Sequence, residues 1–198
     1  MAMQAQALSG GFHEPVYDSQ AVFRLLMDGM ARPGTVQTVS IDIGQPTPLG
    51  RAAGAIALTL CDADTPVWLQ PAVAKSAAAE WIVFHTGATI IAEKAEARLA
   101  FLTAGSRPCS PGLFSAGTQE YPDRSTTLVI EVESFTSGKT MTLSGPGIKT
   151  PLTATVAGLP DIFLSFWADN RGLFPRGVDV ILTAGDRLLC LPRTTTIA

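Results

Sequence analysis

The chain has 198 residues, a length that fits one domain of ordinary size, and the expected organisation is a single domain spanning residues 1–198. Hydrophobic residues make up 46% of the chain and charged residues only 16%, a composition that excludes an intrinsically disordered protein. The net charge of −3, without a basic run, excludes the usual electrostatic footprint of nucleic-acid binding.

The order of residues argues against export and membrane insertion. No apolar run is long enough for a transmembrane helix, and the first basic residue is Arg24, so the charged start of a signal peptide is missing. The cysteines, Cys61, Cys109 and Cys190, are odd in number and lie far apart, which argues against a disulfide framework or a zinc site. We therefore expect a cytoplasmic protein with no membrane contact.

The shortage of charge also bears on assembly. A monomer of this size with 16% charged residues has few groups with which to solvate its surface. We therefore expect a homodimer in solution.

Helices and strands are predicted to alternate in the first half of the chain. A helix should start near Asp18, with Asp18 or Ser19 as its N-cap, and stop at Pro33 and Gly34. It should be followed by an extended piece (35–43), a helix (49–61), a strand (66–70), a helix (75–84) and a strand (98–102).

The second half is predicted to contain strands at 126–132 and 140–143 joined by a hairpin at 134–139, a helix with Pro160 at its first position, and strands at 178–183 and 187–192. Residues 188–191 are apolar without alternation, which is typical of a strand covered on both faces. The pattern predicts an α/β fold, a three-layer α/β/α sandwich with a mixed sheet. Residues 1–13 are expected to form a flexible N-terminal arm.

Two glycine-containing segments share features with phosphate-binding loops. Residues 137–140 (SGKT) contain the GKT end of a P-loop, but Glu133 stands where that loop needs a glycine, and strand-like residues follow, so a hairpin turn is expected. In residues 144–150, Gly145 and Gly147 would let the backbone approach a phosphate, with Lys149 as the cation. A plain turn is the simpler interpretation of this second segment as well.

Other candidate ligand-binding residues lie at the predicted ends of elements. The densest polar loop, residues 117–125, contributes Tyr121, Asp123 and Arg124, although a solvated turn explains it too. Isolated arginines at element ends could bind anions, or could cap helices and form ion pairs. These arginines are Arg32, Arg176 and Arg193.

No residue is predicted to be catalytic. Neither of the two histidines, His13 and His85, has a cysteine or an acid at a spacing used by metal sites, so no metal is expected. The surroundings of Ser115 lack the first glycine of a GxSxG nucleophile motif.

A set of short segments supplies more information through its order. These segments are 15–20 (PVYDSQ), 23–24 (FR), 30–34 (MARPG), 58–60 (LTL), 64–69 (DTPVWL), 84–86 (FHT), 143–148 (LSGPGI), 174–175 (FP), 177–179 (GVD) and 191–195 (LPRTT). In this order they resemble the H-subunit (PhnH) family of the bacterial carbon-phosphorus lyase system, and the match leaves the first dozen residues outside.

The resemblance implies a cytosolic subunit of phosphonate breakdown. In this system the G, H, I and L subunits together replace the adenine of ATP by a phosphonate, giving alpha-D-ribose 1-methylphosphonate 5-triphosphate, and the J subunit then cleaves the carbon-phosphorus bond. The partners implied are the G, I, J and K subunits. The fold implied is similar to the large domain of pyridoxal-phosphate-dependent transferases without the cofactor, and none of the four lysines lies in a pattern that we can connect to a Schiff base. No cofactor is therefore expected.

Two functional hypotheses follow from this resemblance. In the first, the chain is a structural or assembly subunit without independent activity. In the second, it binds phosphate-containing ligands through Gly145, Gly147, Lys149 and nearby arginines, and contributes to an active site shared with a partner.

Overall fold

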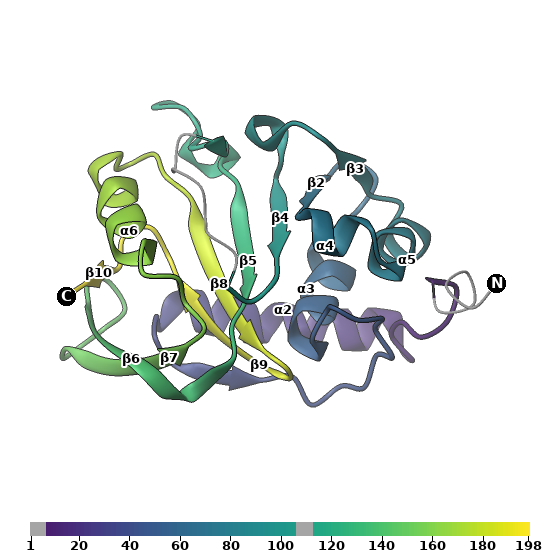
Figure 1. The fold of residues 1–198 in the computed structure, drawn as a ribbon, viewed down its shortest axis with the longest axis horizontal. Coiled ribbons are helices and arrows are strands. Elements are labelled where there is room, and N and C mark those ends of the chain that lie inside the picture. The colour runs from purple at the N-terminus through teal and green to yellow at the C-terminus, as the bar shows by residue number, and fades with distance from the viewer. Residues whose placement is uncertain (1–6, 106–112) are drawn as a thin grey trace.

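The computed structural model describes residues 7–105 and 113–198, and its centre is a mixed seven-stranded sheet (Figure 1). The strands of this sheet are β1 (Val36–Thr38), β2 (Pro66–Leu69), β3 (Thr89–Ile91), β4 (Leu99–Leu102), β5 (Thr127–Glu131), β8 (Asp179–Ala184) and β9 (Arg187–Leu191). Their order is β1-β9-β8-β5-β4-β2-β3. The five strands from β8 to β3 are parallel to one another, whereas β9 and β1 are antiparallel to their neighbours.

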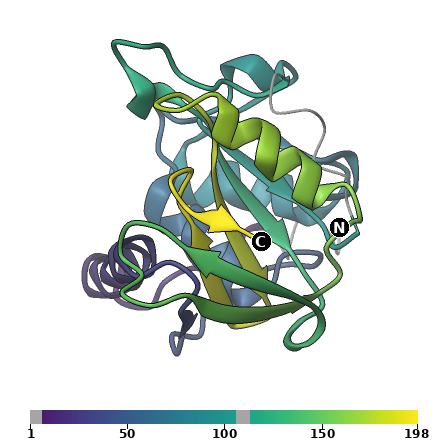
Figure 2. The ribbon, with the colours of Figure 1, turned by 90° about the vertical axis from the view of Figure 1, so that its left-hand side faces the viewer.

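Helices cover one face of this sheet, and a helix together with a second, smaller sheet covers the other (Figure 2). The first face carries α2 (Pro15–Ala31), α3 (Arg51–Leu60) and α5 (Ala77–Thr86), and the short α4 (Pro71–Ala74) precedes α5. The second face carries α6 (Phe163–Gly172) and an antiparallel sheet of β6 (Ser134–Ser144), β7 (Leu152–Ala157) and β10 (Thr196–Ile197). Two 3-10 turns, Lys94–Glu96 and Pro122–Arg124, precede β4 and β5.

The central strands are apolar on both sides because each side faces a separate core. In β8, Ile181 packs with the α2, α3 and α5 side, whereas Val180 and Leu182 pack with the α6 side. Successive side chains of a strand point to opposite faces, so a strand between two layers needs a continuous apolar run. The prediction of a mixed sheet buried on both faces is confirmed, but half of one outer layer is a sheet and not helices.

The α5 helix shows how local sequence sets its ends. The hydroxyl of Ser76 accepts a hydrogen bond from the backbone N–H of Ala78 at 3.2 Å, which caps the start of the helix. Gly87, with φ of 73°, ends it in the left-handed conformation that glycine adopts without strain. The predicted helix at 75–84 therefore begins two residues later and is separate from α4.

The structure corrects three predictions for the second half. Residues 134–139 do not form a hairpin between two strands of one sheet, since they belong to β6, which pairs with β7 and β10 and not with β5. The β6–β7 ladder is irregular between Ser134 and Lys139, so the GKT segment lies in a distorted strand. Pro160 is not the first residue of a helix, because α6 begins at Phe163.

The described part of the predicted N-terminal arm contacts the rest of the fold. Ala7 is buried, the backbone N–H of Gly11 donates to the carbonyl of Ile43 at 2.6 Å, and the indole of Trp81 donates to the carbonyl of Ser9 at 2.9 Å. Residues 1–6 lie outside the described residues.

Candidate functional site

Arg193 joins three segments at the end of the sheet where the parallel strands begin. Its guanidinium binds the carboxylate of Asp179, the first residue of β8, through Nε and Nη2. Its Nη1 donates to the carbonyls of Pro122 at 2.7 Å and Pro175 at 3.4 Å, and its Nη2 also donates to the hydroxyl of Ser125. The loops before β5 and β8 are thereby tied to the segment that follows β9.

All five N–H groups of this guanidinium have acceptors inside the protein. The side chains of Arg193 and Asp179 are only 13% and 23% exposed, so their charges compensate each other in a partly desolvated place. An added anion would have to displace one of these acceptors. Arg193 therefore holds the loops before β5 and β8 and the segment after β9 together at this end of the sheet.

The neighbouring loop places the other predicted polar residues on the surface. Tyr121, Asp123 and Arg124 are exposed, and the Arg124 guanidinium lies over the Tyr121 ring at 4.3 Å from the ring centre. Arg124 also lines an open hollow of about 460 Å³ whose charged lining side chains are of both signs. The residues around this hollow are Asp64, Pro66, Ala95, Glu96, Ala97, Arg98, Ser115 and Arg124.

The two glycines of residues 144–150 are needed by packing. A Cβ at Gly147 would lie 2.3 Å from the carbonyl oxygen of Ala31, and one at Gly145 would lie 2.9 Å from that of Thr194. Both glycines have positive φ, and the segment is the connection between β6 and β7. Lys149 is exposed in this loop. The glycines therefore allow the loop to lie against the end of α2 and the segment after β9.

The two remaining arginines are solvent-exposed. Arg32 follows α2 and forms an ion pair with Asp28 at 3.0 Å, with both side chains more than half exposed. Arg176 is exposed in the loop between α6 and β8.

A hollow of about 240 Å³ brings together residues from three of the short segments named in the sequence, 143–148, 174–175 and 191–195. It is lined by Pro146, Arg171, Phe174, Arg193 and Thr194. Arg171, in the last turn of α6, forms no ion pair within the described residues, and Phe174 is 63% exposed. An unpaired arginine beside an exposed ring can hold an anionic or aromatic group. Sequence analysis did not single out Arg171, and it marked Phe174 only as part of the family resemblance, since only the tertiary structure brings α6 beside the glycine loop.

The opposite end of the sheet contains a partly buried carboxylate that sequence analysis did not single out. Glu131, the last residue of β5, accepts hydrogen bonds from the hydroxyl of Thr183 at 2.6 Å and from the N–H of Gly185 at 3.0 Å. Burial raises the pKa of Glu131 in spite of these two bonds. A Cβ at Gly50, directly before α3, would lie 2.6 Å from its Oε1, so the carboxylate fills the space at the start of that helix.

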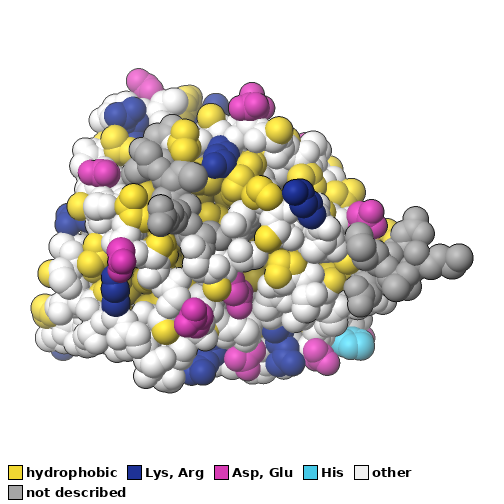
Figure 3. Space-filling model, viewed as in Figure 1, with side chains coloured by type: hydrophobic (Ala, Val, Ile, Leu, Met, Phe, Trp, Pro, Cys, Tyr) yellow, Lys and Arg dark blue, Asp and Glu magenta, His cyan; other side chains and the backbone are white. Residues whose placement is uncertain are grey.

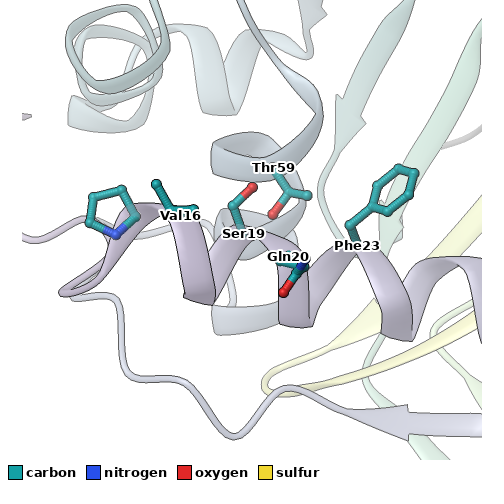
Figure 4. Close-up of a pocket in the computed structure, with 6 residues that line it drawn as sticks. Val16, Ser19, Gln20, Phe23 and Thr59 are labelled. Atoms are coloured by element: carbon teal, nitrogen blue, oxygen red, sulfur yellow. The ribbon is translucent and has the colours of Figure 1, made fainter.

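A shallow groove of about 470 Å³ lies between α2 and α3 (Figure 4). Apolar side chains of α2 border it and continue along the helix, where Val16 is 78%, Phe23 48% and Met27 56% exposed. At its base the buried Oγ1 of Thr59 has no hydrogen-bond partner among the described residues. The rest of the lining is Pro15, Ser19 and Gln20. On the face seen in Figure 3, charged side chains are also few, and hydrophobic side chains are scattered between them.

Groups with nucleophilic or metal-binding chemistry are few in the part of the chain that the structure describes. Burial raises the pKa of the Cys61 and Cys190 thiols to about 12, so neither is a thiolate near neutral pH. Residues 7–105 and 113–198 contain no group of three or more His, Cys, Asp or Glu side chains that could hold a metal ion. Among the same residues, no helix is both long and apolar enough to cross a membrane. Cys109 lies outside the described residues.

Comparison with known proteins identifies the family. The family model described as "Bacterial phosphonate metabolism protein (PhnH)" matches residues 10–198. The chain is 53% identical over 197 residues to the "Alpha-D-ribose 1-methylphosphonate 5-triphosphate synthase subunit PhnH" of Rhizobium meliloti (strain 1021), covering 100% of this chain and 98% of that protein. It is also 36% identical over 81 residues to the "Putative C-P lyase subunit protein HtxG" of Stutzerimonas stutzeri, covering 41% of this chain and 42% of that protein. The resemblance found in the short sequence segments is confirmed, and the chain belongs to the PhnH family of bacterial phosphonate metabolism proteins.

Proposed function

We propose that this chain is a structural subunit of the carbon-phosphorus lyase complex that forms alpha-D-ribose 1-methylphosphonate 5-triphosphate from ATP and a phosphonate. The observation that carries this proposal is the 53% identity, along the whole chain, to a synthase subunit of that product. In the reaction, adenine leaves the ribose of ATP and a phosphonate takes its place. The chain contributes surfaces that hold the other subunits, and the reaction belongs to the complex.

Two features of the molecule support an assembly role. Large apolar side chains are exposed on α2 and α6, including Tyr17, Phe23 and Leu164, and subunit interfaces bury surfaces of this kind. Arg193 has the most side-chain hydrogen bonds of any arginine in the described residues, and all of them are to acceptors of its own chain. The proposal includes a single cytoplasmic domain of residues 1–198, a homodimer of the free chain, and the G, I, J and K subunits as partners. It also includes a fold similar to cofactor-free pyridoxal-phosphate-dependent transferases.

The decisive experiment is reconstitution with one component left out. The complex is co-expressed with and without this chain, supplied with the L subunit, and adenine release from ATP plus methylphosphonate is measured. We expect release from the full set and none from the isolated chain or from the set lacking it. Activity of the set without the chain would contradict the subunit role, and turnover by the chain alone would contradict a purely structural role.

The second candidate function is binding of a phosphate-containing ligand at the hollow beside Arg171. This candidate is favoured by the unpaired guanidinium of Arg171, the exposed ring of Phe174 and the nearby loop that carries Lys149. Calorimetric titration of the isolated chain with ATP tests it. Saturable binding that is weakened about tenfold by Arg171→Ala or Lys149→Ala would favour this candidate over the structural role. The matched control is Arg187→Ala, on β9.

A further inference from the structure

The outer edge of β7 carries backbone groups that no other strand satisfies. The order of the smaller sheet is β10-β6-β7, so β7 is paired on one side only, within residues 7–105 and 113–198. Edge strands of this kind are templates for pairing with another chain.

The hydrogen bonds of β6 show which residues of β7 face outward. Thr142 of β6 exchanges both of its backbone hydrogen bonds with Ala198, at 2.8 and 2.9 Å. Its neighbour Met141 must then direct its N–H and C=O toward β7, where it lies opposite Ala154. Because these directions alternate along a strand, Thr153 and Thr155 point their N–H and C=O groups away from β6, to the free edge.

This edge has none of the usual protection against pairing. Residues 152–157 (LTATVA) include no charged side chain and no proline, and the irregularity in the ladder lies in the opposite strand, β6. The edge strands of the large sheet are three residues long, and β10 has two, whereas β7 has six. Of the sheet edges in the described chain, β7 is therefore the best suited to accept a strand.

We propose that the outer edge of β7 pairs in antiparallel fashion with β7 of a second copy of this chain, with the two-fold axis at Ala154. This inference names the surface of the homodimer proposed above and rests on that part of the proposal. The sequence around Ala154 reads nearly the same in both directions, Leu-Thr-Ala-Thr-Val, and a two-fold interface requires such self-complementarity. Thr153 then exchanges both backbone hydrogen bonds with Thr155 of the partner subunit, and Thr155 does so with Thr153 of the partner subunit.

The neighbouring symmetric registers are poorer. Centring the pair on Thr153 would place Thr155 opposite Pro151 of the partner subunit, which has no N–H to donate. Centring it on Thr155 would use Ala157, whose carbonyl already accepts from the N–H of Glu133 at 2.9 Å. A register shifted by a single residue would place inward side chains opposite outward ones.

The side chains fit the register centred on Ala154. Ala154 and Val156 are buried and Leu152 is partly buried against the same core, so the inner faces of the two copies continue each other with Leu152 opposite Val156 of the partner subunit. Thr153 and Thr155 form cross-strand threonine pairs on the outer face. No charged side chain is brought into the strand pair.

The flank of the strand meets a further apolar feature of the second copy. In this register Lys149 lies opposite position 159 of the second copy, near Asp161, whose carboxylate already forms an exposed ion pair with Lys139, so the contact at this flank rests on apolar groups. Leu159 also borders an apolar hollow of about 300 Å³ at the start of α6, which the incoming loop can cover. The hollow is lined by Lys139, Thr140, Met141, Leu159, Pro160, Phe163 and Leu164.

Register-specific crosslinking tests the inference in a Cys109→Ser background. At the two-fold axis, facing Cα atoms of an antiparallel non-hydrogen-bonded pair are about 4.5 Å apart, within the range of a disulfide. Ala154→Cys should therefore give an oxidised, covalently linked dimer as the main species on a non-reducing gel. The matched control is Ala157→Cys on the same strand, whose two copies would be about 20 Å apart and should remain unlinked.

A second pair of variants tests the edge without a crosslink. Thr153→Lys combined with Thr155→Lys places lysines opposite lysines, and should weaken the dimer about tenfold or more by light scattering or sedimentation. Val36→Lys combined with Thr38→Lys places the same charges on the exposed edge strand β1 and should leave the dimer unchanged. Thermal melting verifies that each variant is folded.

The outcomes separate this inference from the proposal on which it rests. A dimer in which Ala154→Cys does not crosslink, or which survives the Thr153 and Thr155 lysine variant, overturns the β7 pairing and leaves the homodimer in place. A monomer at micromolar concentration overturns both. Dimer disruption by β7 lysines that also prevents recovery of the G, I, J and K subunits, with no Ala154→Cys crosslink, would assign the edge to another subunit and overturn pairing with a second copy.

Discussion

The two ends of the central sheet accommodate partly buried charges in opposite ways. At the end where the parallel strands begin, Asp179 faces the guanidinium of Arg193, and every donor of that guanidinium has an acceptor. At the other end, the carboxylate of Glu131 has hydrogen bonds from Thr183 and Gly185 but no ion pair in the described chain. At the first end, the opposite charges of Asp179 and Arg193 stabilise each other. At the second end, the charge of Glu131 has no opposite charge beside it, and its partial burial raises the pKa of this carboxyl group.

The largest effect is expected at the compensated end. Arg193→Ala leaves Asp179 without its cation and removes the link between three segments, so the free energy of unfolding should fall by about 3 kcal/mol, measured by urea denaturation. Arg176→Ala, an exposed arginine from the same region, is the control and should change stability by less than about 0.5 kcal/mol. Equal effects of the two variants would show that the Arg193 network does not stabilise the fold.

A steric change at the other end is expected to have an intermediate effect. Gly50→Ala puts a Cβ 2.6 Å from Glu131 Oε1 and 2.9 Å from the carbonyl of Gly185, which should lower the free energy of unfolding by about 2 kcal/mol. Gly172→Ala, in α6, meets no atom within 4 Å and should stabilise by about 0.5 kcal/mol. If Gly50→Ala is tolerated as well as Gly172→Ala, the close contact around Glu131 is not rigid.

The smallest expected effect has the opposite sign. Glu131→Gln removes the buried charge and can keep both hydrogen bonds, so the variant should be more stable than the natural protein at pH 7 to 8 by up to about 1 kcal/mol. Because the folded-state pKa lies above the ordinary 4.5, the natural protein should lose stability as pH rises from about 4.5 through the raised value. Below pH 4.5 the two proteins should be equal.

Denaturation curves from pH 4 to 8 measure this difference. A Glu131→Gln variant that is less stable at neutral pH would mean that the hydrogen bonds from Thr183 and Gly185 to the charged carboxylate outweigh its burial.

Much of the secondary structure could be predicted from local patterns. The helices α2 and α3 and the strands β2, β4, β5, β8 and β9 lie where apolar periodicity and turn residues placed them, within a few residues. The prediction of Asp18 or Ser19 as the N-cap of α2 is wrong, because the helix starts at Pro15 and the Asp18 carboxylate accepts from the N–H of Glu14 at 2.9 Å. The strands β3, β7 and β10 were not predicted, since they are short or threonine-rich and their pairing partners are distant in sequence.

In the candidate site, too, some residues could be identified from local sequence, whereas their roles could not. Arg193 and the glycine loop could be singled out because arginine and glycine at element ends are informative residue types. Their roles could not be read locally, since the five acceptors of Arg193 and the close neighbours of Gly145 and Gly147 come from segments far along the chain. In the sequence, nothing distinguishes Glu131 from another acidic residue at the end of a strand. Only the tertiary structure places its carboxylate against the start of α3.

The sequence by itself determined the class of fold and the family, because these depend on periodicity and on the order of short segments. The tertiary structure alone decided that β6 lies outside the central sheet, that β7 presents Thr153 and Thr155 at a free edge, and that Arg193 has an ion-pair partner whereas Glu131 has none among the described residues. Burial, strand pairing and hydrogen-bond saturation depend on which distant segments meet, and local sequence does not encode this in any pattern of a few residues.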